Sequence, residues 1–214
     1  MTRVATLTAA TLPGCRSLPR VAPGPQRADP AMAAAVAALV ERAAPRCGSV
    51  LVVAIDGPSG AGKTTLARAV GRLVDAHVVH MDDIYPGWDG LAEAVPLVTS
   101  QLLEPLSHGE DAAYRRWDWM RHRWGRTQPV AHAPRLVLEG VGSSVLPAGT
   151  YAAVRVWVEA PRELRFRRGM RRDGETYRPQ WERWAAQESA LFAADGTRAR
   201  ADLVVDTGPG NVIS

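Results

Sequence analysis

Apolar residues in this chain fall into short continuous runs, separated by longer segments in which apolar positions recur with a helical period. Continuous runs of this length are typical of strands that are buried on both faces of a parallel sheet. The predicted strands span residues 50–56, 77–81, 135–139, 154–159 and 203–206. The predicted helices span residues 30–44, 63–74, 91–106, 161–172 and 181–194. Alternating strands and helices pair through right-handed crossovers, so the pattern predicts a three-layer α/β fold with a five-stranded, mainly parallel sheet.

Residues 1–28 differ from the rest of the chain, because they contain four arginines and several Pro and Gly but no acidic residue. Segments so poor in packing residues stay disordered. We therefore predict a disordered tail over residues 1–28 and one folded domain over residues 29–214. Two alternatives stay open: a transit peptide, which is also rich in Arg and poor in acidic residues, and a natural start at Met32.

The charge balance changes this picture little. Lys and Arg total 26 residues against 22 acidic ones, for a net charge of +4. Lys63 is the single lysine, so the arginine excess reflects a bias in composition and is weak support for a nucleic-acid partner. Cys15 and Cys47 lack metal or disulfide spacing, and no apolar run is long enough for a membrane span. The composition favours a cytoplasmic protein with free thiols, and leaves the oligomeric state open.

A phosphate-binding motif stands between the first predicted strand and the following helix. Residues 57–64 read Gly-Pro-Ser-Gly-Ala-Gly-Lys-Thr and match G-x-x-x-x-G-K-[ST] in full. Glycines allow the N–H groups of such a loop to turn inward as an anion nest at the start of a helix. Lys63 would contact the β- and γ-phosphates of ATP, and Thr64 would place its hydroxyl on Mg²⁺. The predicted nucleotide-binding residues are Gly57, Ser59, Gly60, Ala61, Gly62, Lys63, Thr64 and Thr65.

Carboxylates follow two of the other predicted strands. Asp82 and Asp83 come after the strand at 77–81, and Glu139 ends the strand at 135–139. Ligands of open α/β sheets bind at the carboxyl ends of the strands. Asp82 can therefore accept the proton of an attacking hydroxyl and help hold the metal, while Glu139 can reach Mg²⁺ directly or through water. A solvated turn explains Asp83 equally well. The sequence lacks the Asn-Lys-x-Asp motif that reads guanine, which argues against a GTPase switch.

Arginines are concentrated in the predicted helix at 161–172. Arg165, Arg168 and Arg172 are spaced i, i+3, i+7, so one helical face presents three guanidinium groups. Such a face can clamp a transferring phosphoryl group. We count Arg168 and Arg172 with Lys63 and Asp82 as catalytic candidates, although a solvated basic face remains the alternative.

Aromatic residues gather in the segment Tyr-Arg-Arg-Trp-Asp-Trp at residues 114–119. Aromatic rings with hydrogen-bonding neighbours can stack on a planar ring and read its edges, although tryptophans of this kind also build cores. We expect the acceptor molecule in this region. The predicted substrate-binding residues are Asp83, Tyr85, Tyr114, Trp117 and Asp118.

In chain order, GPSGAGKT, MDDIY, YRRWDW, LEG and R-x-x-R-x-x-x-R-D resemble the uridine kinase-like group of P-loop kinases over about residues 48–207. The resemblance implies phosphoryl transfer from ATP to a sugar hydroxyl, with Asp82 as general base and Tyr85 in the acceptor pocket. It also implies that Thr64 and Glu139 hold Mg²⁺ and that the arginine helix belongs to a lid near residues 162–182. Tyr114 and Asp118 would match the aromatic and the acid on the pyrimidine side of that family's site.

The sequence departs from this family at the acceptor side. The stretch between Asp82 and Tyr114 is short for the hairpin that grips uridine, and residues 115–117 interrupt the family's tighter Tyr-Asp pair. We therefore predict a kinase of a small hydroxyl-bearing molecule, in first place a uridine- or cytidine-like nucleoside. Another small substrate, such as a sugar, a cofactor precursor or an aminoglycoside-like compound, is the first alternative. A nucleic-acid-linked NTPase is the second, and would hydrolyse ATP without a phosphorylated small product.

Overall fold

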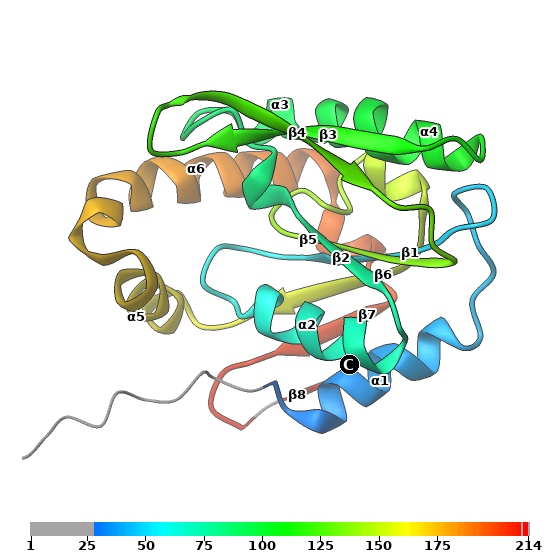
Figure 1. The fold of residues 1–214 in the computed structure, drawn as a ribbon. Coiled ribbons are helices and arrows are strands. Elements are labelled where there is room, and N and C mark those ends of the chain that lie inside the picture. The colour runs from blue at the N-terminus through cyan, green and yellow to red at the C-terminus, as the bar shows by residue number, and fades with distance from the viewer. Residues whose placement is uncertain (1–27, 211, 214) are drawn as a thin grey trace, which may run out of the picture.

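Strands and helices alternate along most of the chain (Figure 1), and the computed structural model describes residues 28–210 and 212–213. The strands are β1 Leu51–Asp56, β2 His77–His80, β3 Ala112–Asp118, β4 Arg123–Val130, β5 Arg135–Glu139, β6 Ala152–Glu159, β7 Leu203–Asp206 and β8 Val212–Ile213. The α-helices are α1 Pro30–Val40, α2 Lys63–Leu73, α3 Leu91–Val98, α4 Glu104–Ser107, α5 Arg162–Asp173 and α6 Arg178–Asp195. The tail predicted over residues 1–28 lies outside the described residues, apart from Ala28.

The main sheet has the strand order β2-β5-β1-β6-β7-β8. Its first five strands are parallel, which confirms the predicted five-stranded parallel sheet, and β8 adds a short antiparallel edge. Glu139 is in register with both Ile55 of β1 and His80 of β2. The carboxyl ends of these three strands therefore meet at one edge of the sheet.

Helices cover both faces of this sheet (Figure 1) and make three layers. All six residues of β1 are buried, which accounts for its continuous apolar run. Successive side chains point to opposite faces: Val53 joins the core formed with α1 and α2, whereas Val52 joins the core formed with α3, α4 and the segment between them. In the described part of the chain, no helix combines the length and apolar character that a membrane span requires.

One long helix predicted over residues 91–106 consists of α3, a π-helical turn at Thr99–Leu103 and α4. Pro105 has no N–H to donate to the carbonyl four residues earlier. Just before Pro105, the N–H of Glu104 donates to the carbonyl of Thr99, five residues back, where an α-helix would use the carbonyl four residues back. In the same layer, Cys47 is a free, buried thiol that donates to the Leu103 carbonyl at 3.2 Å, and burial raises its pKa to about 11. Cys15 lies outside the described residues.

The hairpin made by β3 and β4 was not predicted; its two strands form a separate antiparallel sheet. Ala112 and Tyr114 point inward and are buried, while Ala113 and Arg115 are exposed. Only one face of this ribbon touches the core, so it lacks the continuous apolar run that revealed the strands of the main sheet. The hairpin begins at Ala112, so most of it lies after the stretch between Asp82 and Tyr114 that is short for the hairpin that grips uridine.

Candidate active site

The phosphate-binding motif forms the loop between β1 and α2, and its glycines have backbone angles that other residues rarely adopt. Gly57 and Gly60 have φ values of 131° and 77°. A Cβ atom on Gly57 would lie 2.0 Å from the Val158 carbonyl oxygen, and one on Gly60 would lie 2.3 Å from that of Arg165. The loop therefore needs glycine for its conformation and for its close contact with β6 and α5.

This loop has donors that suit a phosphate group. Among the described residues, none accepts a hydrogen bond from the backbone N–H groups of Gly60, Gly62, Lys63 or Thr64. The Lys63 ammonium folds over the same loop, donating to the carbonyls of Gly57 at 2.7 Å and Pro58 at 3.0 Å. N–H groups at a helix N-terminus, together with one ammonium, match the requirements of a polyphosphate chain.

Glu139 and Thr64 come together opposite this loop, as the sequence analysis predicted for a Mg²⁺ site. The Thr64 hydroxyl donates to Oε1 of Glu139 at 3.0 Å, and Glu139 is only 4% exposed. No group of three or more His, Cys, Asp or Glu side chains in the described ranges is arranged to hold a metal. Mg²⁺ commonly takes only one or two protein oxygens and completes its shell with phosphates and water, so this pair of oxygens fits it.

His80 is a member of this site that the sequence analysis did not predict. Its Nδ1 lies 2.5 Å from the same Oε1 of Glu139, and this hydrogen bond raises the pKa of His80. The two residues are 59 positions apart and meet because β2 pairs with β5 in the register that places His80 beside Glu139. A histidine at the end of a strand was the only sequence signal for it.

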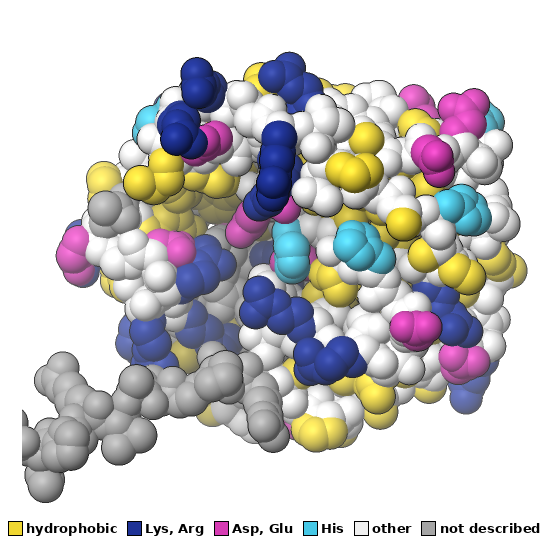
Figure 2. All heavy atoms as spheres, viewed as in Figure 1, with side chains coloured by type: hydrophobic (Ala, Val, Ile, Leu, Met, Phe, Trp, Pro, Cys, Tyr) yellow, Lys and Arg dark blue, Asp and Glu magenta, His cyan; other side chains and the backbone are white. Residues whose placement is uncertain are grey.

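Asp82 and Asp83 follow β2 in a short 3₁₀ turn, Met81–Asp83. The Asp82 side chain is exposed to solvent on one side and surrounded by protein atoms on the other. The loss of solvation on the protein side, and secondly the charge of Glu139, raise the pKa of Asp82. Asp83 accepts hydrogen bonds from Arg116 at 2.7 Å and from the Tyr114 hydroxyl at 3.3 Å. The face drawn in Figure 2 shows acidic, basic and histidine side chains gathered around a hollow in the surface.

Two residues predicted to bind the acceptor have other contacts in the structure. Tyr85 is 1% exposed, donates its hydroxyl to the Val141 carbonyl at 2.9 Å and packs edge-on against Trp184. Asp118 ends β3, where its carboxylate accepts hydrogen bonds from the backbone N–H groups of the following turn. Tyr85 is thus a packing residue in this structure, and Asp118 caps the turn of the hairpin. Sequence spacing alone could not reveal either contact.

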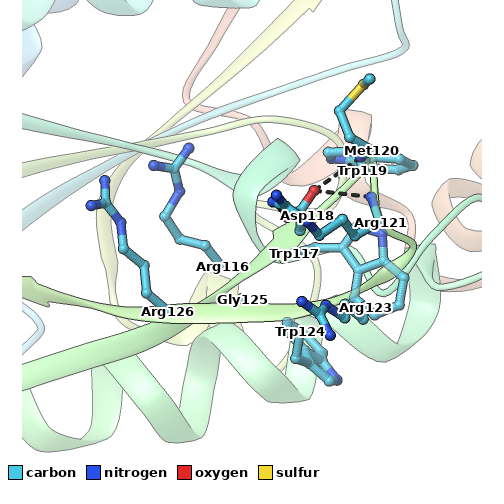
Figure 3. A pocket seen from close by; sticks show the side chains of 10 residues that line it. All are labelled: Arg116, Trp117, Asp118, Trp119, Met120, Arg121, Arg123, Trp124, Gly125 and Arg126. Carbon is cyan, nitrogen blue, oxygen red and sulfur yellow. Dashed lines mark hydrogen bonds and ion pairs between the residues drawn. The ribbon is translucent and has the colours of Figure 1, made fainter.

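Tyr114, Trp117 and their neighbours lie on the hairpin, where a pocket of about 650 Å³ opens (Figure 3). Trp117 packs edge-on against Trp124. The indole N–H of Trp119 donates to the backbone carbonyl of Asp82 at 2.8 Å. The residues lining the pocket are Arg116, Trp117, Asp118, Trp119, Met120, Arg121, Arg123, Trp124, Gly125 and Arg126. The hairpin therefore contacts the two aspartates directly through Tyr114, Arg116 and Trp119.

The three α5 arginines that were predicted to clamp a phosphoryl group separate into two groups. Arg165 donates to the carbonyl of Ser59 at 3.1 Å, and Arg168 donates to Thr207 and lies 3.4 Å from the Ala61 carbonyl. Both therefore pack on the phosphate-binding loop. Arg172 is paired with Asp173; this hydrogen bond raises the pKa of Arg172, and the charge of Asp82 adds to the effect.

Ser59 is held at all three of its polar groups by the segment that follows β6. Its N–H donates to Oε1 of Glu188 at 2.7 Å, its hydroxyl lies 2.9 Å from that of Tyr177, and its carbonyl accepts from Arg165. Glu188 is 3% exposed, and burial raises its pKa. We call Arg165, Tyr177 and Glu188 the Ser59 clamp. Sequence reasoning missed Tyr177 and Glu188, since neither belongs to a motif.

Asp56, the last residue of β1, is fully buried beneath the site. Its carboxylate accepts hydrogen bonds from the N–H groups of Gly57, Gly142 and Ser144 at 2.7–2.9 Å, and from the Ser144 hydroxyl at 2.9 Å. Asp56 thus fixes the phosphate-binding loop relative to the loop that follows Glu139.

Comparison with known proteins gives one curated relative and several folds of the same type. The chain is 30% identical over 179 residues to a cytidylate kinase from Pyrobaculum arsenaticum, an alignment that covers 74% of this chain and 84% of the relative. No family model matches the sequence.

Two solved structures share the fold at 21% sequence identity. A possible uridine kinase from Bacillus stearothermophilus has a TM-score of 0.54, covering 72% of this chain and 88% of the other. A candidate fructose transport system kinase from Silicibacter sp. TM1040 has a TM-score of 0.58, covering 81% and 98%.

Proposed function

Because this chain belongs to the P-loop kinases, we propose that it transfers the γ-phosphoryl group of ATP to a hydroxyl of a small molecule. The observation that carries the proposal is the meeting of Thr64 and Glu139 at 3.0 Å, beside Lys63 and the loop N–H groups. This arrangement supports the binding of ATP by the loop and of Mg²⁺ by the two side-chain oxygens.

In this proposal Asp82 is the general base. Its position after β2, next to Glu139 and within the electrostatic reach of Arg172, supports that role. The acceptor hydroxyl attacks the γ-phosphorus, its proton passes to Asp82, and the bond to the β-phosphate oxygen breaks to release ADP. Lys63 and Arg172 compensate the charge on the transferring group.

We also propose that residues 162–182 act as a lid on the domain that spans residues 29–214. The support is that two members of the Ser59 clamp, Arg165 and Tyr177, belong to this segment and touch the phosphate-binding loop. A segment in contact with the loop can respond to nucleotide and exclude water from the site. We propose a cytoplasmic location, where ATP is available.

For the acceptor, we propose a uridine- or cytidine-like compound in first place, with sugars and cofactor precursors as alternatives. The curated relative is a cytidylate kinase, and the structural neighbours include a possible uridine kinase and a candidate fructose transport system kinase. These names span nucleotides, nucleosides and sugars, so they support a small polar acceptor.

An assay of acceptor-dependent ADP release tests the proposal, using nucleosides, nucleoside monophosphates and sugars. We expect at least one acceptor to drive ADP release and to yield a phosphorylated product, and the Asp82→Asn variant to lose this activity. Asp111→Asn, an exposed site in the loop before β3, is the matched control and should keep it. ATP hydrolysis that RNA or DNA stimulates, without a phosphorylated small product, would replace the kinase proposal by that of a nucleic-acid-linked NTPase.

A further inference from the structure

We infer that the acceptor carries an anionic group, a phosphate or a carboxylate, and that Arg116 and Arg126 on the inner face of the hairpin bind it. The inference rests on the proposed function and narrows its substrate class. It follows from the direction of the two side chains, from their charge and from the contact of Arg116 with Asp83.

The alternation of the hairpin places Arg116 and Arg126 on the face that meets the rest of the protein. Ala112 and Tyr114 point inward on β3 and Val130 points inward on β4, with Ala112 paired to Val130. Arg116 continues the inward series of β3, and its side chain reaches Asp83. Arg126 continues that of β4, and in Figure 3 both arginine side chains extend in the same direction, away from Trp117. The register of the β3–β4 pairing shifts between Arg115 and Trp117, next to these two side chains.

The two arginines are unequally neutralised. Arg116 is paired with Asp83 at 2.7 Å. Arg126 is exposed and has no ion pair or hydrogen bond with any residue from 28–210 or 212–213. Two like charges on adjacent strands destabilise a hairpin unless an opposite charge lies between them. An anion bound across both guanidinium groups would supply that charge, because each group offers a planar set of N–H donors.

The surroundings give the site a second feature. Of the ten residues that line the pocket, four are arginines and three are tryptophans, and the one acidic residue, Asp118, is already paired with Arg121. Since Asp118 does not compete for them, Arg116 and Arg126 can take up an anionic group of the acceptor. Since Arg116 binds Asp83 and Trp119 binds the carbonyl of Asp82, such an acceptor would lie next to the proposed base.

Composition alone does not account for this arrangement. Arg115, the neighbour of Arg116 on β3, points outward and lies over the Trp124 ring at 5.5 Å. It shows where a solvated arginine of this hairpin lies, and it provides a control on the same strand.

The test compares neutral and anionic acceptors in matched pairs: cytidine with its monophosphate, uridine with its monophosphate, and fructose with a fructose phosphate and with a sugar acid. Wild type, Arg126→Gln, Arg116→Gln and the control Arg115→Gln are assayed with each pair. Because Arg126 has no described contact to lose, and its substitution removes a like charge beside Arg116, the thermal unfolding temperature should not fall. We expect the anionic member of at least one pair to be the better substrate.

For that acceptor, Arg126→Gln should raise KM about 10- to 100-fold, the usual effect of losing a hydrogen bond to a charged group. Its kcat and its KM for ATP should stay near wild-type values, and Arg115→Gln should change nothing. Higher salt should raise the KM of the wild type more than that of Arg126→Gln. The pair that responds tells whether the anion is a phosphate or a carboxylate.

Two results would overturn the inference while the kinase proposal stands: preference for the neutral member of every pair that is phosphorylated, or an unchanged KM in Arg126→Gln. If no acceptor of either kind is phosphorylated, the proposed function falls and the inference falls with it. Direct titration of each purified variant with the preferred anionic acceptor in the absence of ATP provides a readout independent of turnover, and should show the same loss of affinity.

Discussion

Replacing Glu188 by alanine should destabilise the phosphate-binding loop, although Glu188 and Ser59 are 129 residues apart. In the folded protein the Glu188 carboxylate is the acceptor for the buried N–H of Ser59 and lies 3.9 Å from the Arg165 guanidinium. Alanine removes both contacts and adds none. Glutamine keeps an oxygen at the same place and removes only the charge. The two substitutions therefore separate the hydrogen bond from the charge.

The magnitude follows from the burial of the two groups. An unsatisfied buried N–H costs about 1–3 kcal/mol. Removal of a buried carboxylate recovers part of its desolvation cost, so we expect Glu188→Ala to lower the free energy of unfolding by about 2 kcal/mol. In a domain of this size that corresponds to a fall of about 4–8 °C in Tm. Glu188→Gln should stay within about 1 kcal/mol of the wild type, because the hydrogen bond remains.

The pKa of Glu188 adds a signature in pH. Burial raises that pKa in the folded state, so the folded protein holds the proton to higher pH than the unfolded chain does. The contribution of Glu188 to stability is therefore largest below its ordinary pKa, and it is lost as pH rises through the raised value. Glu188→Gln should remove this part of the pH dependence.

Thermal unfolding of the wild type and both variants, with and without ATP and Mg²⁺, measures these effects. Glu182→Ala is the control on the same helix, since Glu182 is exposed and forms a surface ion pair with Arg162. Its Tm should change little, as is usual for surface pairs. An unchanged Tm in Glu188→Ala would show that the bond to Ser59 contributes nothing. Equal losses in the two Glu188 variants would show that the charge, and not the acceptor oxygen, holds the loop.

Three further changes test the site. Asp82→Asn should lower kcat about 10²- to 10⁴-fold, because the general base is lost. Desolvation and, secondly, the charge of Glu139 raise the pKa of Asp82. The wild-type rate should therefore fall with decreasing pH at a pH above the pKa of an ordinary aspartate, which a pH–rate profile checks. Tyr85→Phe removes a buried hydrogen bond to Val141 and should cost about 1 kcal/mol in thermal unfolding, with the acceptor KM unchanged; a raised KM would return Tyr85 to the acceptor pocket. Gly60→Ala places a Cβ 2.3 Å from the Arg165 carbonyl oxygen and should weaken ATP binding at least about fivefold by strain of 1 kcal/mol or more, measured by calorimetric titration; unaltered binding would contradict the need for glycine.

The main sheet could be predicted because its strands are buried on both faces. The predicted strands at 135–139 and 203–206 match β5 and β7, and the predicted strand at 50–56 differs from β1 by one residue. Burial on both faces requires an uninterrupted apolar run, and such a run is visible in the sequence without any knowledge of its neighbours. The phosphate-binding loop was visible for a related reason, since its geometry depends on local glycines.

The remainder of the site depends on contacts between distant segments. His80 reaches Glu139 only through the register of two strands, and Glu188 reaches Ser59 only through the packing of α6 against the loop. Neither residue differs in its local sequence from an ordinary histidine or glutamate. The hairpin was missed because only half of it is buried, and the burial of Tyr85 depends on Trp184, which lies in α6, far along the chain.

Among the residues that the structure describes, the hairpin shares no ladder hydrogen bonds with the main sheet, because β3 and β4 pair with each other. An engineer could therefore exchange it for the hairpin of another kinase without breaking the sheet that carries the phosphate-binding loop. The exchange would affect the reaction centre, however, because Arg116 holds the Asp83 carboxylate and Trp119 holds the backbone carbonyl of Asp82. A transplanted hairpin must bring equivalents of these two side chains, or the new specificity would come with a displaced base.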